Sequence, residues 1–188
     1  MEKLYKGINY TAIGLLFMVL SINIDFGVFR INIIPDWVGF ILMFFALCEF
    51  EDDRHKHLLL KIVSIIGALF AIAEWIIEIL NNPIDITMFS FVFSLLKLLM
   101  IFAVLGIVIR IAKAVKSPYA QKLNVTRTVM LLGLVLTLIA AILTYYLDEM
   151  FALAATVAGA VVLICAVITI IMMNGFKKEL KNLEAQSE

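Results

Sequence analysis

Residues 86–111 read ITMFSFVFSLLKLLMIFAVLGIVIRI, and Lys97 is the only charged residue in this stretch before Arg110. A bilayer core about 30 Å thick is crossed by roughly 20 helical residues, so the stretch is long enough for one membrane span. A lysine near the centre of such a span is costly to insert and is therefore rare. The stretch predicts a transmembrane helix that carries a polar site.

The whole chain has the composition of a membrane protein. Its 188 residues are 64% hydrophobic and 16% charged, whereas a soluble domain is about half apolar and about one-quarter charged. A soluble core cannot absorb that much apolar surface, but lipid solvates the outer faces of membrane helices. We therefore expect a single domain over residues 1–188, an all-α polytopic helix bundle embedded in the lipid bilayer.

Six segments meet or approach the length of a membrane span. They are residues 9–24, 35–50, 58–80, 86–111, 128–147 and 150–174. The residues that follow, 175–188, carry alternating charge and are typical of a short, solvated helix extension that forms a cytoplasmic tail. The pattern predicts six transmembrane helices.

The basic residues indicate how these helices are oriented. Every Lys and Arg except Arg30 and Lys97 lies before the first segment, after the second, around the connection after the fourth, or in the tail. Positive residues near helix ends are held on the cytoplasmic side of a membrane. This alternation predicts that both termini are cytoplasmic, and it agrees with six spans.

Polar residues at helical spacing lie on two neighbouring segments. Lys97 shares a helical face with Ser90 and Ser94, and Glu74 shares a face with Glu78 on the preceding segment. Because the connection between them is short, we expect the two segments to be antiparallel neighbours in space. Glu74 would lie roughly 7 Å nearer the outer surface than Lys97, a gap that a lysine stem nearly closes. The spacing predicts an ion pair between Lys97 and Glu74.

Weaker polar stripes on the first and fifth segments include Ser21, Asp25 and Thr144. In one interpretation, these stripes surround an outward-facing polar pocket with Lys97 at its floor. In the other, the polar groups form interhelical hydrogen bonds of about 0.6 kcal/mol each, and Lys97 is a satisfied buried ion. The sequence leaves both interpretations open.

The connection between the first two segments is too apolar for a freely solvated loop. Pro35 suits the start of a helix because it lacks an N–H that would be unpaired there, and Asp36 complements the helix dipole. Trp37 is typical of a membrane interface. Arg30 and Asp36 form either a ligand or partner site, or a local ion pair where the second helix begins.

Residues 34–40, Ile-Pro-Asp-Trp-Val-Gly-Phe, resemble a Leu-Pro-Asp-Phe-Ile-Gly-Tyr segment that follows the first span in an uncharacterised group of small multi-pass membrane proteins from Gram-positive bacteria. The likeness extends over residues 1–50 and departs at the first, fourth, fifth and last motif positions by similar residue types. The resemblance implies a location in the bacterial cytoplasmic membrane and brings no activity with it.

The sequence carries few features of an enzyme or a metal site. His55 and His57 lie in the polar stretch 51–57, but two imidazoles without a nearby cysteine are few for a zinc site, and a solvated turn is favoured. There is no Ser and His pair within the spans, no His-Glu-x-x-His motif and no Gly-rich phosphate loop. We expect no catalytic residue, metal, cofactor or nucleic-acid partner.

Three classes of function remain. The first is a non-enzymatic accessory or regulatory subunit that acts through a membrane-protein partner or as a homo-oligomer. The second is a small-solute or cation transporter that uses the outer pocket above Lys97. The third, a membrane-embedded enzyme, is the least favoured because no catalytic pattern is present.

Overall fold

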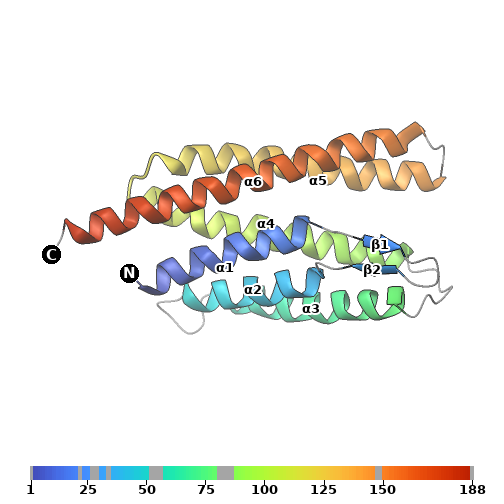
Figure 1. Ribbon diagram of the computed structural model, residues 1–188, viewed down its shortest axis with the longest axis horizontal. Helices are drawn as coiled ribbons and strands as arrows, with labels where there is room; N and C mark the ends of the chain where they lie inside the picture. The colour runs from blue at the N-terminus through green and yellow to red at the C-terminus, as the bar shows by residue number, and fades with distance from the viewer. Residues whose placement is uncertain are drawn as a thin grey trace. The chain divides into compact units, whose positions relative to one another are not determined.

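The computed structural model describes residues 2–20, 23–25, 30–32, 35–50, 57–79, 87–146 and 150–186. Within these ranges the chain forms six helices and one pair of short strands (Figure 1). In chain order they are α1 (Glu2–Val19), β1 (Asn23–Asp25), β2 (Arg30–Asn32), α2 (Asp36–Glu49), α3 (Leu58–Ile79), α4 (Thr87–Ala114), α5 (Tyr119–Tyr146) and α6 (Met150–Ala185). Apart from the strand pair, the described part is all-helical, as predicted.

Four of the described helices are long and apolar enough to cross a membrane. The apolar stretches are Leu58–Ile77, Val92–Ala114, Tyr119–Ala140 and Leu153–Ala185. They indicate a multi-pass membrane protein. The other two helices are different: α1 opens with Glu2, Lys3 and Lys6, and α2 has only 14 residues, which is about 21 Å of helix.

The first predicted span, residues 9–24, differs from the helix that forms. Helix α1 begins earlier, at Glu2, and its first turns carry an i, i+4 ion pair of 2.7 Å between Glu2 and Lys6, in which the hydrogen bond from Lys6 lowers the pKa of Glu2. It ends at Val19, and Asn23–Asp25 form strand β1 instead. Asn and Asp are weak helix formers. Pairing with β2 places Asn23 opposite Asn32, and Asp25 opposite Arg30.

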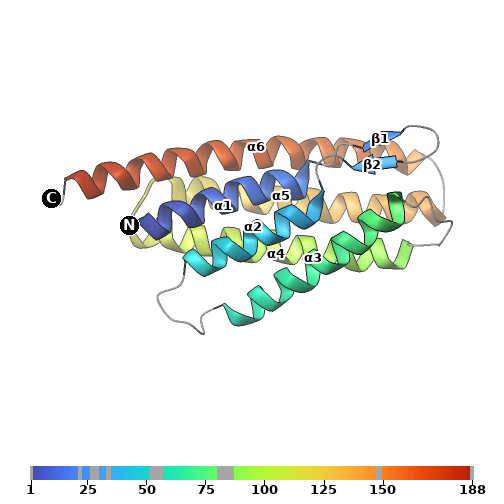
Figure 2. The same cartoon turned by 60° about the horizontal axis from the view of Figure 1, so that its bottom comes forward.

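The chain folds into two compact units, Met1–Val104 and Leu105–Glu188. In the first unit α1 packs against α2, and α2 packs against α3 (Figures 1 and 2). Helices α1 and α2 approach closely at Gly14 and Gly39. A Cβ atom on Gly39 would lie 3.0 Å from the carbonyl oxygen of Gly14 and 2.7 Å from Cγ of Met18. Glycine at position 39 therefore sets the spacing of the two helices.

The core of the first unit lies between these helices. Its fully buried side chains include Ile8, Leu15, Met18, Phe40, Met43 and Leu47. The Ser64 hydroxyl of α3 donates a hydrogen bond to the Phe40 carbonyl of α2. On the outside of α3, Leu59 and Leu69 are 74% and 62% exposed. An exposed apolar face of this kind is what a lipid-facing helix requires.

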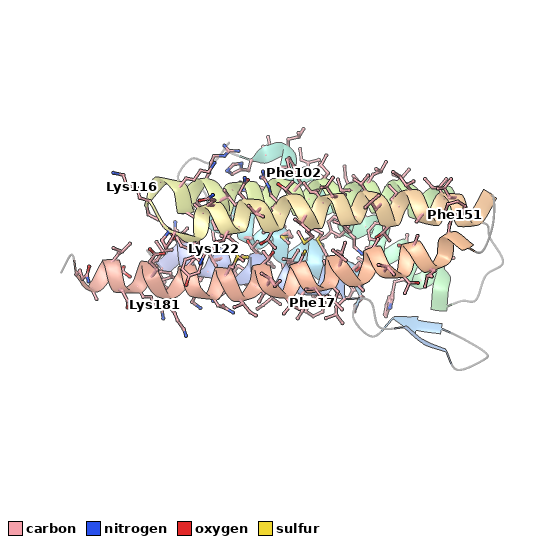
Figure 3. The ribbon with its side chains drawn as sticks, turned by 90° about the horizontal axis from the view of Figure 1, so that it is seen from above. Phe17, Phe102, Lys116, Lys122, Phe151 and Lys181 are labelled. Carbon is pink, nitrogen blue, oxygen red and sulfur yellow. The ribbon has the colours of Figure 1, made fainter. Side chains whose placement is uncertain are left out.

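The second unit is built around the antiparallel hairpin of α5 and α6. Gly133 of α5 allows close contact, because a Cβ atom there would lie 2.7 Å from Cγ2 of Val162 on α6. Figure 3 shows Lys116, Lys122 and Lys181 at one end of this hairpin and Phe151 at the other. The basic end is the one that the charge pattern predicts to be cytoplasmic.

Both hairpin helices extend beyond the predicted spans at this basic end. Helix α5 starts at Tyr119 rather than at residue 128, and α6 continues to Ala185. Ser117 accepts a hydrogen bond from the Tyr119 N–H and donates one to Glu179, which links the two ends. Phe176 and Leu180 are fully buried. The predicted loop before α5 is thus largely helical, because its apolar side chains pack against α6.

Candidate functional site

A buried ion pair joins α2 and α4 within the first unit. Nζ of Lys97 lies 2.7 Å from Oδ2 of Asp36, and the two side chains are only 19% and 15% exposed. Removing both charges from water is costly, and burial is tolerable only when each charge has a close partner. The pair is therefore the main polar feature of the first unit's described interior.

The position of the pair follows from the local geometry of two helices. Lys97 lies roughly 15 Å along α4 from Thr87. Its stem leans toward the start of the helix, as helical side chains do, and brings Nζ to 5.6 Å from the ring centroid of Phe93. Asp36 is the first residue of α2, where the helix dipole favours a carboxylate. The two charges meet because the lysine stem reaches back toward the first turn of α2.

Aromatic rings fix the start of α2 against its neighbours. The rings of Phe40 and Phe93 lie 5.6 Å apart, so α2 and α4 contact each other one turn from the ion pair on each helix. The indole rings of Trp37 and Trp75 meet edge to face at 6.5 Å and join α2 to α3. Such pairs are favourable beyond the area that they bury. The first turn of α2 is therefore held by both α3 and α4.

Two buried polar atoms in this turn have unused hydrogen-bonding capacity. Oδ1 of Asp36 and Nε1 of Trp37 are inaccessible to solvent and have no hydrogen-bond partner among the residues that the structure describes. Buried polar atoms without a partner are uncommon and costly. The site thus offers one acceptor and one donor in addition to the ion pair.

The sequence predicts an ion pair between Lys97 and Glu74, but the structure gives Lys97 another partner. Among the described residues, Lys97 pairs with Asp36 of α2 and not with Glu74 of α3. Helical spacing gives depth along one helix, but it does not show which neighbouring helix begins at that depth. Glu74 is half-buried and has an interaction of its own.

The structure describes fewer details of the other predicted site residues. Ser94 is half-buried on α4. The backbone places Glu78 in α3, Ser90 in α4 and Thr144 in α5, and it places Asp25 opposite Arg30 in the strand pair. The side chains of those five, and Ser21 as a whole, lie outside the part that the structure describes. The pocket expected from these residues stays a prediction.

Asp36 and Trp37 gained roles that the sequence argument did not assign. The sequence assigns Asp36 to the start of the second helix and to a pair with Arg30, and it assigns Trp37 to the membrane interface. A carboxylate in the interior could have been found from charge balance, because a buried lysine requires an anion and Asp36 opens a hydrophobic segment. No comparable signal marks Trp37.

The hairpin of the second unit carries a separate, apolar feature. A groove of about 790 Å³ runs between α5 and α6. Small residues from both helices line part of it: Gly133, Ala140, Ala154 and Ala158. Small side chains allow another helix to approach closely within a membrane.

Metal-binding side chains are not gathered in the described part of the chain. No group of three or more His, Cys, Asp or Glu side chains is close enough there to hold a metal ion. His55, one half of the His-x-His pattern, lies outside the described residues.

Fold and site together define a class: an all-helical protein with four helices able to cross a membrane and a buried Lys–Asp pair in its first unit. Comparisons with family models, with curated proteins and with solved structures find no match to this chain. The case for a function therefore depends on the geometry of the site.

Proposed function

We propose that this chain is a non-enzymatic carrier of small polar solutes in the bacterial cytoplasmic membrane. It crosses the membrane six times, with both termini in the cytoplasm, and binds its solute at Asp36, Trp37 and Lys97. One observation carries the proposal: a buried ion pair lies beside a carboxylate oxygen and an indole N–H that no described residue satisfies. Ionisable groups inside a membrane bundle commonly mark solute or ion pathways.

If the ion pair had only a structural role, we would expect fewer buried atoms beside it with unused hydrogen-bonding capacity. Oδ2 of Asp36 accepts a hydrogen bond from Lys97, but Oδ1 of the same carboxylate and Nε1 of Trp37 have no hydrogen-bond partner among the described residues. A partly satisfied buried polar cluster is less stable than an apolar core. A solute that supplies the missing donor and acceptor would offset this cost, which supports a binding role for the cluster.

The test is protein-dependent solute flux into proteoliposomes that contain the full chain. Labelled glycerol, serinol and glycerate serve as neutral, cationic and anionic three-carbon probes, with protein-free vesicles as the baseline. The Trp37→Phe change removes the indole N–H but keeps an aromatic ring, so flux should fall roughly fivefold. Trp75→Phe is the matched control and should retain flux. Flux of all three probes equal to that of empty vesicles would overturn the proposal.

A second candidate function is an accessory or regulatory subunit that acts through a membrane-protein partner. The observation that favours it is the groove between α5 and α6 with its small lining residues. The occupant would be a transmembrane helix of the partner, because glycine and alanine permit close helix contact. A cysteine introduced at Ala154, in the groove, should then form a crosslink of defined mass in native membranes. A cysteine at Leu59, on the exposed face of α3, is the control and should form none.

A further inference from the structure

The net charge of the cluster formed by Asp36, Trp37 and Lys97 limits which solutes can bind there. This inference rests on the proposed carrier function. Lys97 and Asp36 carry opposite charges at 2.7 Å and are both largely buried, so the pair is neutral as a whole. Glu74, a half-buried carboxylate on the adjoining α3, already has an interaction of its own. A cationic or anionic solute would bring a charge without a free counter-charge into a poorly hydrated site.

The unused hydrogen-bonding atoms of the cluster also favour an uncharged, polar solute. Oδ1 of Asp36 can only accept, and Nε1–H of Trp37 can only donate. A solute that fits must therefore bring at least one donor and one acceptor. A hydroxyl group supplies both, and a polyol repeats them along its chain while its C–H groups pack on the aromatic ring of Trp37.

From the net charge and the unused hydrogen-bonding atoms, we infer that Asp36, Trp37 and Lys97 form a binding site for an uncharged, hydroxyl-bearing solute. The ion pair provides no net charge to attract an ionic ligand, and the two unmatched atoms match a hydroxyl group. The same reasoning gives a rule for specificity: removing one member of the ion pair should redirect the site to a solute of that member's charge.

Binding can be followed at Trp37 itself. The chain has two tryptophans, Trp37 and Trp75, so the Trp75→Phe variant leaves Trp37 as the sole reporter of indole fluorescence. The detergent-solubilised full chain is titrated with glycerol, serinol and glycerate at equal ionic strength. Glycerol should give a saturable change in emission, and the two charged probes should bind at least tenfold more weakly.

Variants then separate binding from simple loss of structure. Asp36→Asn leaves the Lys97 charge uncompensated and should reverse the preference toward glycerate, whereas Lys97→Met should reverse it toward serinol. Trp37→Phe should weaken glycerol roughly fivefold, measured by calorimetry. If an ion-pair variant does not fold, the titration of the Trp75→Phe chain with the neutral, cationic and anionic probes still tests the inference.

The outcomes for the inference and for the carrier proposal are distinct. If serinol or glycerate binds as tightly as glycerol, or if no probe binds, the inference is wrong. Protein-dependent flux of a charged probe but not of glycerol would keep the carrier and overturn the inference. Glycerol binding at Trp37 without any protein-dependent flux would keep the site and overturn the carrier.

Discussion

At the scale of single residues, the molecule depends on how two charges are held away from water. Lys97 and Asp36 come from helices far apart in sequence, and each makes the burial of the other tolerable. The aromatic contact between Phe40 and Phe93 holds the same two helices one turn away. The energetic consequence is asymmetric: losing one charge is worse than losing both, because a single survivor is left buried without a partner.

This asymmetry predicts the result of a double-mutant cycle. Lys97→Met and Asp36→Asn should each destabilise the protein by about 3 kcal/mol, and the double variant should lose much less than their sum. The measurement is thermal unfolding in detergent, followed by circular dichroism. The matched control combines Lys97→Met with Glu74→Gln, whose effects should add. Coupling in the control cycle and additivity in the first would mean that the lysine pairs with Glu74.

The site was partly predictable from sequence. Lys97 stood out because a lone charge in a long apolar stretch must be neutralised. The identity of its partner was not predictable, since Asp36 and Glu74 both lie near the ends of hydrophobic segments. Choosing between them requires the depth at which α2 begins, which depends on tertiary packing rather than on local pattern.

At the scale of helices, close packing between α1 and α2 depends on glycine. At Gly39 a methyl group would meet backbone atoms of α1 as well as the Met18 side chain. Backbone cannot move aside as a flexible side chain can, so the two helices would have to separate.

Gly39→Ala should therefore destabilise the first unit by about 2 kcal/mol, despite the higher helix propensity of alanine. Gly159 of α6 provides the control, since no atom lies within 4 Å of the position of its added Cβ. Gly159→Ala should be neutral or slightly stabilising because only propensity changes there. Chemical unfolding in mixed micelles compares the two. Equal losses at both positions would show that helix spacing at Gly39 is not the cause.

The helices themselves were largely predictable, and the differences have identifiable causes. Helices α2, α3 and α4 follow predicted segments to within a few residues, because long apolar runs leave little alternative. The end of α1 and the strand pair were missed, since hydrophobicity continued past the residues that favour an extended backbone. The start of α5 was missed because several of its first residues are polar, although Ala120 and Leu123 are buried in the hairpin with α6.

At the scale of the whole molecule, four of the described helices are suited to cross a membrane, and the number of crossings depends on whether the shorter α1 and α2 also cross it. The basic residues support six crossings, since a helix that returned without crossing would put a basic connection on the outer side. In this arrangement the connection between α3 and α4 is external and both termini are internal.

Reporter fusions test this arrangement directly. Alkaline phosphatase, which is active only outside the cytoplasm, should be active when fused within residues 81–85 and inactive when fused after Glu188. A cytoplasmic fluorescent reporter should give the opposite pattern. The chain should also remain in the membrane fraction after alkaline carbonate washing. If the phosphatase fused after Glu188 were active, the C-terminus would lie outside the cytoplasm. This result would contradict an even number of spans that begins with a cytoplasmic N-terminus.

The length of α2 has a consequence for the surrounding lipid. Its 14 residues span about 21 Å, some 9 Å less than a typical hydrocarbon core. In the proposed six-span arrangement, acyl chains beside α2 would have to compress or let headgroups approach its ends, so the bilayer would be thinned next to this helix. Lipids with shorter tails relieve this mismatch, and we expect the protein to be most stable in the thinnest membranes that still cover α3 and α4.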